Sequence, residues 1–382
     1  AWLVYDISNE PGALALVGLA WTLPQVGVLL LAGVGSDRFE RRLLLVLADL
    51  IRFAAIGSIA VLSLAGVIEL WHVVVLVVFY GVGQALFQPA FAAIVPDVVP
   101  REQLLQANAL REVMEPLGMR FGGPALGGFL IALFGVGEAL LVDAATFVVS
   151  AIAVSLMSRR PAIRTEHGSL RADLAEGFAY VRGHSWLWAT LAGAAFFLLA
   201  TYGPFEVLLP YIIRNDLGGD ATTFGAVLAA GGLGSIAAAL ILSRTGAPRR
   251  HVTFMWCAWG VGTTLDIGLA VASAAWQMCA IAFLSFGCAT AGMVIWSTLM
   301  NTLVPAEMLG RVTSVDWFVS IGLIPVSFAL TAPVAEWLGP RTTLGVAGAF
   351  GLLSFALLFV PGVRDPERLP LPGGRAQPIS ST

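Results

Sequence analysis

Apolar stretches of about twenty residues recur along almost the whole sequence, separated by short segments that carry most of the charges. Each stretch has the length that a helix needs to cross about 30 Å of hydrocarbon. Only helices and closed barrels satisfy their backbone hydrogen bonds in lipid, and uninterrupted apolar stretches lack the alternation of barrel strands. The pattern therefore predicts an all-α protein that crosses a membrane many times.

The composition excludes several classes of protein. Hydrophobic residues make up 58% of the 382 residues and charged residues only 12%, about half the charged fraction of a soluble domain. A net charge of −3 gives no support for a nucleic-acid partner. Since the sequence contains no Lys, it cannot form an ATP-binding P-loop. A soluble enzyme and an ATP-driven pump encoded in this chain are thus excluded.

We predict eleven complete spans preceded by the end of another at residues 1–8. The predicted spans are 11–36, 42–66, 71–95, 106–134, 138–158, 186–213, 221–243, 252–273, 275–303, 311–337 and 342–361. Residues 1–8 are too few to cross a bilayer, so we expect the first helix to be incomplete and about 20–30 residues to precede it in the native protein.

The arginines predict the orientation, because short cytoplasmic loops are enriched in basic residues. If the loop at 37–42 is cytoplasmic, sixteen of the 21 basic residues lie in cytoplasmic segments and three lie within spans. Only Arg214 and Arg341 lie on the other side. Both termini are then cytoplasmic. The exclusive use of Arg hints at a bacterial source, and we predict a multi-pass protein of the bacterial inner or plasma membrane.

The longest polar segment, 159–185, divides the sequence into an N-terminal six-helix half at 1–158 and a C-terminal half at 186–361. Apolar side chains recur in this linker at helical spacing, namely Leu170, Leu174, Phe178 and Val181. They predict an amphipathic helix on the cytoplasmic membrane surface. The tail at 362–382 contains four prolines and no apolar periodicity, so we expect a disordered cytoplasmic tail.

Two repeated patterns indicate that the halves arose by duplication. The pattern V-P-x-E-x-L occurs at 99–104 and again at 304–309, and each copy precedes a predicted span. The charged loop at 37–42 is matched by a similar one at 243–250. Parallel six-helix halves around a central site are the architecture of one large class of secondary transporters.

The loop between the second and third helices has the form G-x-x-x-D-R-x-x-R-R, with Gly33, Asp37, Arg38, Arg41 and Arg42 at its fixed positions. It resembles the signature that the major facilitator superfamily carries between the same two helices. The resemblance implies the major facilitator fold with two six-helix halves, a cytoplasmic gate at this loop and a monomer. The alternative is a basic stop-transfer loop, which would not explain the glycines or Asp37.

A glycine-rich string lies in the fifth span, where Gly123, Pro124, Gly127 and Gly128 resemble the G-P-x-x-G-G core of a motif linked to exporters of that superfamily. The earlier glycine of that motif would fall at Met119, so the match is partial. Proline removes a helix hydrogen bond and glycine permits close helix contact. The alternative is that these small residues serve helix packing only.

Shorter strings at 48–52, 88–91 and 107–110 resemble the branch that contains enterobactin exporters and macrolide-efflux proteins. The arginine that many proton-driven drug exporters carry in the fourth span is absent here. Its role must lie elsewhere in the chain or be missing.

Acidic residues within spans are costly, so each is a candidate for coupling transport to protons. We rank Glu206 first, because it lies between two prolines and has no cation nearby on its helix, followed by Asp143, Glu115 and Asp49. Asp49 lies three residues before Arg52, and the two charges are expected to neutralise each other. Asp316 lies near the predicted start of its span, where an acid would complement the helix dipole.

The resemblance implies that the first, fourth, seventh and tenth helices line the substrate cavity. The candidates they supply are mainly aromatic and amide side chains, namely Tyr80, Gln84, Phe87, Gln88, Tyr202, Phe205 and Trp296. Such a wall suits an amphipathic small molecule. The alternative for each aromatic residue is helix packing or lipid contact.

Together these features predict a proton-coupled exporter of drugs or siderophores that works by alternating access. The alternatives are a solute importer of the same fold, or a membrane-embedded enzyme or lipid-handling protein. An enzyme is not expected, because the sequence offers no nucleophile–base pair or metal cluster within the spans. The four histidines lie at loops or span ends and lack i, i+4 spacing, so we expect no metal site and no cofactor.

Overall fold

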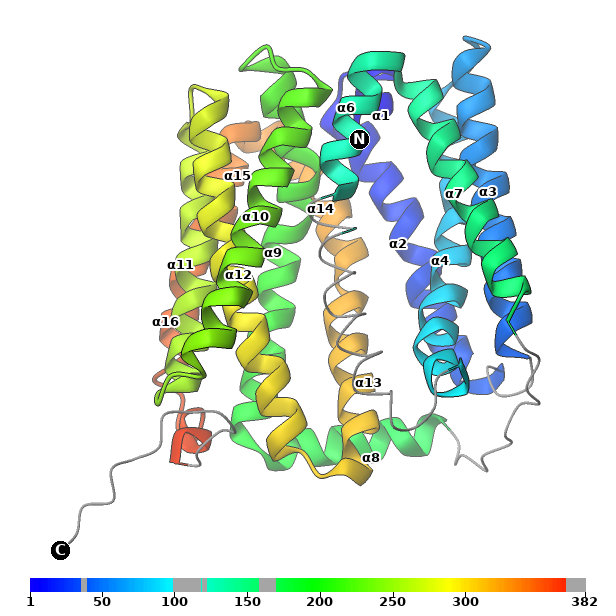
Figure 1. Ribbon diagram of the computed structural model, residues 1–382. Coiled ribbons are helices and arrows are strands. Elements are labelled where there is room, and N and C mark those ends of the chain that lie inside the picture. Colours follow the sequence, from blue (N-terminus) through cyan, green and yellow to red (C-terminus); the bar gives the residue numbers. More distant parts are fainter. Residues whose placement is uncertain (36–39, 99–117, 119–121, 158–169, 369–382) are drawn as a thin grey trace, which may run out of the picture.

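The computed structural model describes residues 1–35, 40–98, 118, 122–157 and 170–368, and its regular elements in these ranges are all helical (Figure 1). The helices before the linker are α1 (Trp2–Ile7), α2 (Pro11–Gly35), α3 (Arg41–Leu64), α4 (Leu70–Val98), α6 (Gly123–Phe134) and α7 (Val136–Ser155). Those after it are α8 (Leu170–Gly183), α9 (Ser185–Asn215), α10 (Ala221–Thr245), α11 (His251–Val271), α12 (Ala275–Leu303), α13 (Ala306–Gly322), α14 (Ile324–Leu338), α15 (Pro340–Ala349) and α16 (Leu353–Leu357). Eight helical stretches within the described ranges are long and apolar enough to cross a membrane, which confirms the all-α membrane fold.

The predicted spans at 311–337 and 342–361 differ in detail from the observed helices. The first is divided at Leu323 into α13 and α14, and Pro325 in the first turn of α14 has no N–H with which to continue the preceding helix. The second is interrupted by a 3₁₀ turn, Phe350–Leu352, between α15 and α16. Most of the predicted span at 106–134 lies outside the described residues, apart from α6 and the residues just before it.

Two single-glycine turns support the duplication. Gly135 between α6 and α7 has a φ of 100°, and Gly339 between α14 and α15 has a φ of 85°. Residues other than glycine rarely adopt such positive φ angles. At both places the chain therefore reverses direction between two helices at a residue without a Cβ. The two glycines are 204 residues apart, close to the spacing of the V-P-x-E-x-L repeat.

The helices form two groups (Figure 1). In the N-terminal half α3 contacts α4 and α7, and α2 contacts α4; in the C-terminal half α12 contacts α10 and α11, while α15 contacts α9 and α11. The halves meet through α2 against α14 and through α6 against α10. In the predicted repeat α2 corresponds to α10 and α6 corresponds to α14, so the two contacts join equivalent pairs of helices.

Close packing at these two interfaces depends on glycine. A Cβ on Gly128 of α6 would lie 3.0 Å from the carbonyl oxygen of Ala221 and 3.2 Å from Cα of Gly225, both on α10. A Cβ on Gly18 of α2 would lie 2.3 to 2.7 Å from ring atoms of Phe328 on α14. Both glycines lie toward the end at which α2 and α10 begin, so the halves are in tight contact at that end.

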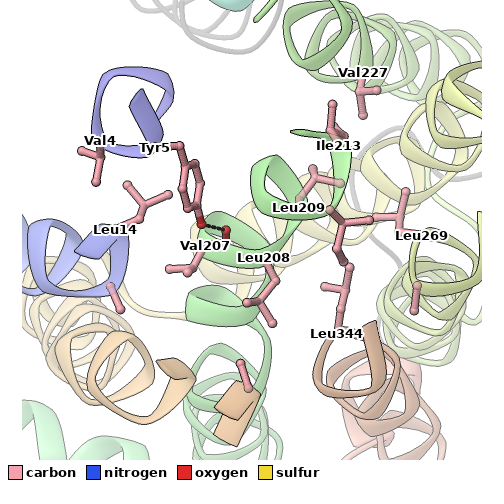
Figure 2. Close-up of a cluster of buried hydrophobic side chains, with 14 of the residues drawn as sticks. Val4, Tyr5, Leu14, Val207, Leu208, Leu209, Ile213, Val227, Leu269 and Leu344 are labelled. Carbon is pink, nitrogen blue, oxygen red and sulfur yellow. Dashed lines mark hydrogen bonds between the residues drawn. The ribbon is translucent and has the colours of Figure 1, made fainter. Parts of the chain in front are cut away.

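The largest apolar core also crosses between the halves at this end (Figure 2). Five of its fully buried side chains come from the second half of α9, namely Val207, Leu208, Leu209, Ile212 and Ile213. They belong to one cluster with Leu269 of α11 and Leu344 of α15, and with Val4 and Leu14 from α1 and α2. The burial of this face fixes the rotation of α9 and therefore the direction in which its other residues point.

Candidate functional site

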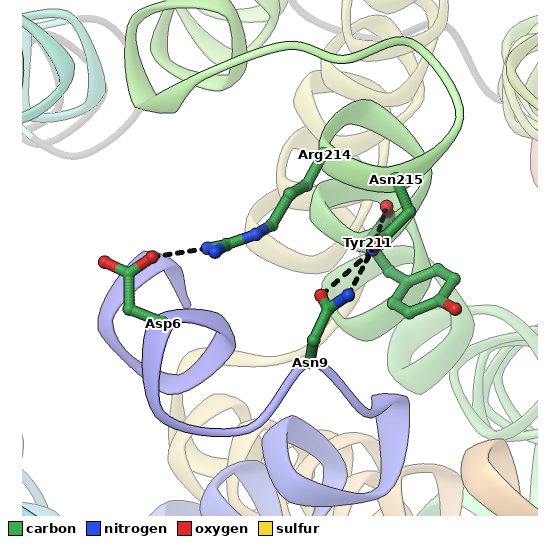
Figure 3. Close-up of polar contacts among 5 residues, drawn as sticks. All are labelled: Asp6, Asn9, Tyr211, Arg214 and Asn215. Carbon is green, nitrogen blue, oxygen red and sulfur yellow. Dashed lines mark hydrogen bonds and ion pairs between the residues drawn. The ribbon is translucent and has the colours of Figure 1, made fainter.

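Polar contacts join α1 and the short segment after it to the end of α9, across the two halves (Figure 3). Arg214 donates from Nη1 to Oδ1 of Asp6 at 2.5 Å. Asn9 and Asn215 exchange side-chain hydrogen bonds of 2.5 and 3.1 Å. We call Asp6, Asn9, Arg214 and Asn215 the α1–α9 latch. Its contacts are exposed, so each contributes little to stability and can be broken at low cost.

A buried contact lies beside the latch. The hydroxyl of Tyr5 donates to the backbone carbonyl of Val207 at 2.6 Å, and both residues are almost completely buried (Figure 2). The ring of Tyr5 also lies 5.8 Å from that of Tyr211. The latch and this contact therefore form one joint between the halves, polar at its edge and buried inside.

The C-terminal side of the latch is held in place by Arg341. Its Nε donates to Oδ2 of Asp216 at 2.5 Å, and its Nη1 donates to the carbonyl oxygens of Ala270 and Ala272, both at 2.9 Å. Arg341 thus joins the end of α9 to the end of α11 and the start of α15. These contacts hold the end of α9, and with it Arg214 and Asn215, in place.

Glu206 lies on α9 immediately before Val207. Its side chain is exposed, although the next four residues along the helix are buried. Pro204 and Pro210 lie within the same helix on either side of it. Glu206 is therefore an accessible carboxylate within a predicted membrane span, one residue from the carbonyl that contacts the other half.

The aromatic candidates on α9 pack against other helices. Phe205 lies 5.6 Å from Phe286 on α12, and Tyr202 lies 5.8 Å from Phe328 on α14, measured between ring centroids. Both side chains remain half-buried. They therefore keep some surface that a ligand could contact.

Trp296 on α12 has a different setting, since only 6% of its surface is exposed. Its Nε1 donates to Oδ2 of Asp316 at 3.2 Å, and its ring lies 6.0 Å from that of Trp186. Asp316 also accepts from Ser320 at 3.3 Å. Because α13 begins at Ala306, Asp316 is not in the first turn, and the prediction that it complements the helix dipole is wrong.

Asp49 and Arg52 of α3 form the ion pair that their spacing predicts, which confirms their mutual neutralisation. Asp49 is fully buried and Arg52 is 6% exposed. The guanidinium also donates from Nη1 to Oε1 of Gln84 at 3.2 Å and lies 4.0 Å from the ring centroid of Phe87, both on α4. Two of the predicted cavity residues thus surround a buried cation.

The remaining candidates near this pair lie on α4 and α7. Tyr80 is half-buried, with its ring 6.1 Å from that of Phe147 on α7. Phe147 in turn lies 4.7 Å from the guanidinium of Arg52. Gln88 is exposed, and so is Asp143, one helical turn before Phe147. The structure therefore brings Asp49, Tyr80, Gln84, Phe87 and Asp143 into one neighbourhood centred on Arg52.

The predicted cytoplasmic gate is described in part. Gly33 lies in the last turn of α2, and Arg41 begins α3. Arg42 donates to the backbone carbonyl of Ser155 at the end of α7. Asp37 and Arg38 lie outside the described residues, as does Glu115 among the proton-coupling candidates.

The exporter-like motif forms the start of α6. Gly123 is the first residue of the helix and Pro124 is in its first turn, where the missing N–H of proline costs nothing. Among the described residues no atom outside its own helix backbone lies within 4 Å of a Cβ built on Gly127, whereas Gly128 packs against the α10 backbone. Of the two adjacent glycines Gly128 is the one that contacts the other half among the residues that the structure describes.

No group of three or more His, Cys, Asp and Glu side chains that could hold a metal occurs in the part of the chain that the structure describes. Asp266, within α11, accepts a hydrogen bond of 2.8 Å from Ser285 of α12 instead.

Comparison with known proteins identifies the family. The sequence profile of the transmembrane secretion effector family, one of the major facilitator families, matches residues 1–370. The chain belongs to this family. The multidrug efflux pump Tap of Mycolicibacterium fortuitum is 28% identical to it, over 95% of this chain and 91% of that protein. Macrolide efflux protein A of Streptococcus pyogenes is 22% identical, over 97% of this chain and 92% of that protein.

Solved structures of the same fold include a bacterial homologue of the iron transporter ferroportin in an inward-facing state, with a TM-score of 0.67 and 16% identity over 93% of each chain. The nucleoside transporter NupG has a TM-score of 0.68 and 10% identity, over 94% of this chain and 92% of that one. These similarities establish the major facilitator fold. The protein is thus a multi-pass membrane transporter of the major facilitator type.

The latch is the main feature that the sequence did not reveal. Asp6 and Arg214 are 208 residues apart, and no periodicity relates them. The available signal was two short polar segments, residues 5–9 and 214–216, each at the end of a predicted span. The bulky neighbours of Arg52 on α4 and α7 were likewise visible only as separate aromatic residues.

Proposed function

We propose that this transporter exports amphipathic small molecules, such as drugs or siderophores, across the bacterial plasma membrane in exchange for protons. The names of its relatives, a multidrug efflux pump and a macrolide efflux protein, support export. The observation that carries proton coupling is the position of Glu206, an accessible carboxylate next to the carbonyl that Tyr5 contacts. A change of charge at Glu206 is therefore placed where it can influence contact between the halves.

Alternating access requires the halves to separate at one end while they close at the other. With the predicted orientation, the α1–α9 latch and the Gly128 interface lie at the outer end. With this orientation the outer end is closed, which corresponds to an inward-facing state. The loop that contains Asp37 acts at the other end as the cytoplasmic gate when the cavity faces outward.

The half-buried aromatic residues Tyr202 and Phe205, with Tyr80, Phe87 and the amides of Gln84 and Gln88, are proposed to contact the substrate. Trp296 is buried and is proposed to support the substrate-contacting residues through its hydrogen bond to Asp316. Asp143, Glu115 and Asp49 remain further candidates for proton binding. The protein works as a monomer, in contact with lipid, and requires no cofactor.

The direction of transport is tested by accumulation of two probes in cells, ethidium as an amphipathic cation and erythromycin as a macrolide. Cells that express the protein should retain less of at least one probe than cells with an empty vector. Equal retention of both probes contradicts export of this class of compound, and higher retention identifies an importer.

Proton coupling is tested with Glu206→Gln, which keeps the shape of the side chain and removes its charge. We expect the variant to lose the response of export to an imposed pH gradient while its level in the membrane stays the same. Glu336→Gln is the matched control, because Glu336 is also exposed on a spanning helix, near the end of α14. If Glu206→Gln responds as the parent does, Glu206 is not the coupling site.

A further inference from the structure

Arg52 is a buried cation in a predicted membrane span with an incomplete set of partners. Nη2 donates to Asp49 and Nη1 donates to Gln84, but Nε has no hydrogen-bond partner in the described part of the chain. Oδ2 of Asp49 also has none, although Asp49 is fully buried. A pair of Arg and a carboxylate is frequently bidentate, with both oxygens bonded. The pair in α3 therefore leaves one guanidinium nitrogen and one carboxylate oxygen without a partner among the described residues.

A second carboxylate lies on the other side of Arg52. Asp143 is four residues before Phe147 on α7, so the two side chains lie on the same helix face. Phe147 contacts the Arg52 guanidinium at 4.7 Å, and Asp143 lies within electrostatic range of it. The Asp143 carboxylate has no hydrogen-bond or ion-pair partner among the described residues, and its side chain is exposed. It can therefore receive and release a proton more readily than Asp49, which is buried.

The charges of this neighbourhood do not balance. The helices around Arg52 contribute Asp49 from α3, Tyr80 from α4 and Asp143 from α7 as titratable groups, with Arg52 the one cation among the described residues there. With both carboxylates ionised the group carries one excess negative charge, which is costly within a membrane span. A proton on Asp143 restores neutrality while Arg52 stays with Asp49.

The aromatic rings provide a surface on which the guanidinium can change its partner. Phe87 on α4 and Phe147 on α7 both lie within cation–π distance, at 4.0 and 4.7 Å. These contacts do not depend on which carboxylate Arg52 binds. Gly83 leaves room for the side chain, since a Cβ there would lie 2.7 Å from Cγ of Arg52.

We propose that Arg52 is a positioning residue of the transport cycle, which pairs with Asp49 when Asp143 is protonated and with Asp143 when that proton is lost. The inference rests on the proposed proton-coupled export and adds a second proton-binding group, in the N-terminal half. The structure, with Arg52 on Asp49 and the latch closed, corresponds to the protonated form. The step needs only the binding or release of a proton at a carboxylate oxygen of Asp143.

The test uses a reporter that requires no substrate. Cysteines at positions 9 and 215 of the full chain, with Cys257, Cys279 and Cys288 replaced by Ala, report latch closure through the yield of a short thiol cross-linker in purified, lipid-reconstituted protein. In the parent reporter the yield should rise as the pH falls. Asp143→Asn, which mimics the protonated acid, should give a high yield that no longer follows pH. Glu138→Gln, which changes an acid in the first turn of the same helix, should behave as the parent.

Arg52→Gln and Asp49→Asn separate an exchange of partners from a fixed ion pair. Arg52→Gln should lower ethidium or erythromycin transport by roughly tenfold or more, since it leaves two carboxylates without a cation. Restoration of full transport by adding Asp49→Asn alone would show a fixed pair and overturn the proposal. The proposal is also overturned if the cross-linking yield of Asp143→Asn responds to pH as the parent's does. This second measurement does not depend on whether Arg52→Gln folds.

Failure of this inference is distinguishable from failure of the proposed function. If transport by the parent ignores a pH gradient, proton coupling itself is wrong. If the parent responds and only Glu206→Gln changes that response, coupling stands and Arg52 with Asp143 has no part in it.

Discussion

Replacement of Gly128 by Ala should favour separation of the halves at the end where α6 meets α10. The new Cβ would lie 3.0 Å from the Ala221 carbonyl oxygen and 3.2 Å from Cα of Gly225. Both neighbours are backbone atoms, so neither can rotate away as a side chain would. Overpacking of this kind costs about 1–3 kcal/mol. If only the closed form bears that cost, the ratio of open to closed protein rises about 5- to 140-fold.

Gly127→Ala is the matched control, because no neighbouring helix in the described part of the chain lies within 4 Å of the Cβ that it adds. Alanine also stabilises a helix by about 0.5–1 kcal/mol relative to glycine, but it does so in both forms and at both positions. The assay is the cross-linking yield of the reporter with cysteines at 9 and 215. We expect the yield to fall for Gly128→Ala and to stay unchanged for Gly127→Ala. Equal yields in the two variants would refute the assignment of Gly128 to the closing interface.

Three further predictions concern the latch, the gate and a helix start. Asp6→Arg and Arg214→Asp should each favour the open form by about 0.2–1 kcal/mol, since the ion pair is partly exposed. The double variant, in which the two charges are exchanged, should restore the cross-linking yield of the parent, measured with a cysteine pair outside the latch. Asp37→Ala should reduce transport while membrane insertion, measured by the amount of protein in the membrane, is retained; full activity would contradict its role in the gate. Asp220 accepts hydrogen bonds from Thr223 at the start of α10, which hold the pKa of its carboxyl below the usual value. Asp220→Ala should therefore lower the free energy of unfolding by about 1 kcal/mol at neutral pH. This difference between variant and parent should vanish as the pH falls through the lowered pKa, because protonation of Asp220 removes the same hydrogen bonds in the parent. Thermal unfolding at several pH values measures the difference.

The sequence predicted what depends on local pattern. Apolar length predicted the spans, and the three-residue spacing of Asp49 and Arg52 predicted their ion pair. Contacts between distant segments were not predictable in this way, because no rule of spacing relates Asp6 to Arg214 or Phe147 to Arg52. The burial of Trp296 escaped prediction for a related reason, since a position on a cavity-lining helix does not determine whether a side chain faces the cavity or its neighbours.

The two interfaces between the halves use corresponding helices but differ in what they bring together. At α2 and α14, Gly18 faces ring atoms of the Phe328 side chain. At α6 and α10, Gly128 faces backbone atoms of Ala221 and Gly225, which cannot change position by a side-chain rotation. Closely packed interfaces favour discrete arrangements over gradual deformation. The α6–α10 contact is therefore the more selective for the closed form, and the α2–α14 contact the more tolerant of movement, although the predicted repeat pairs the same helices in both.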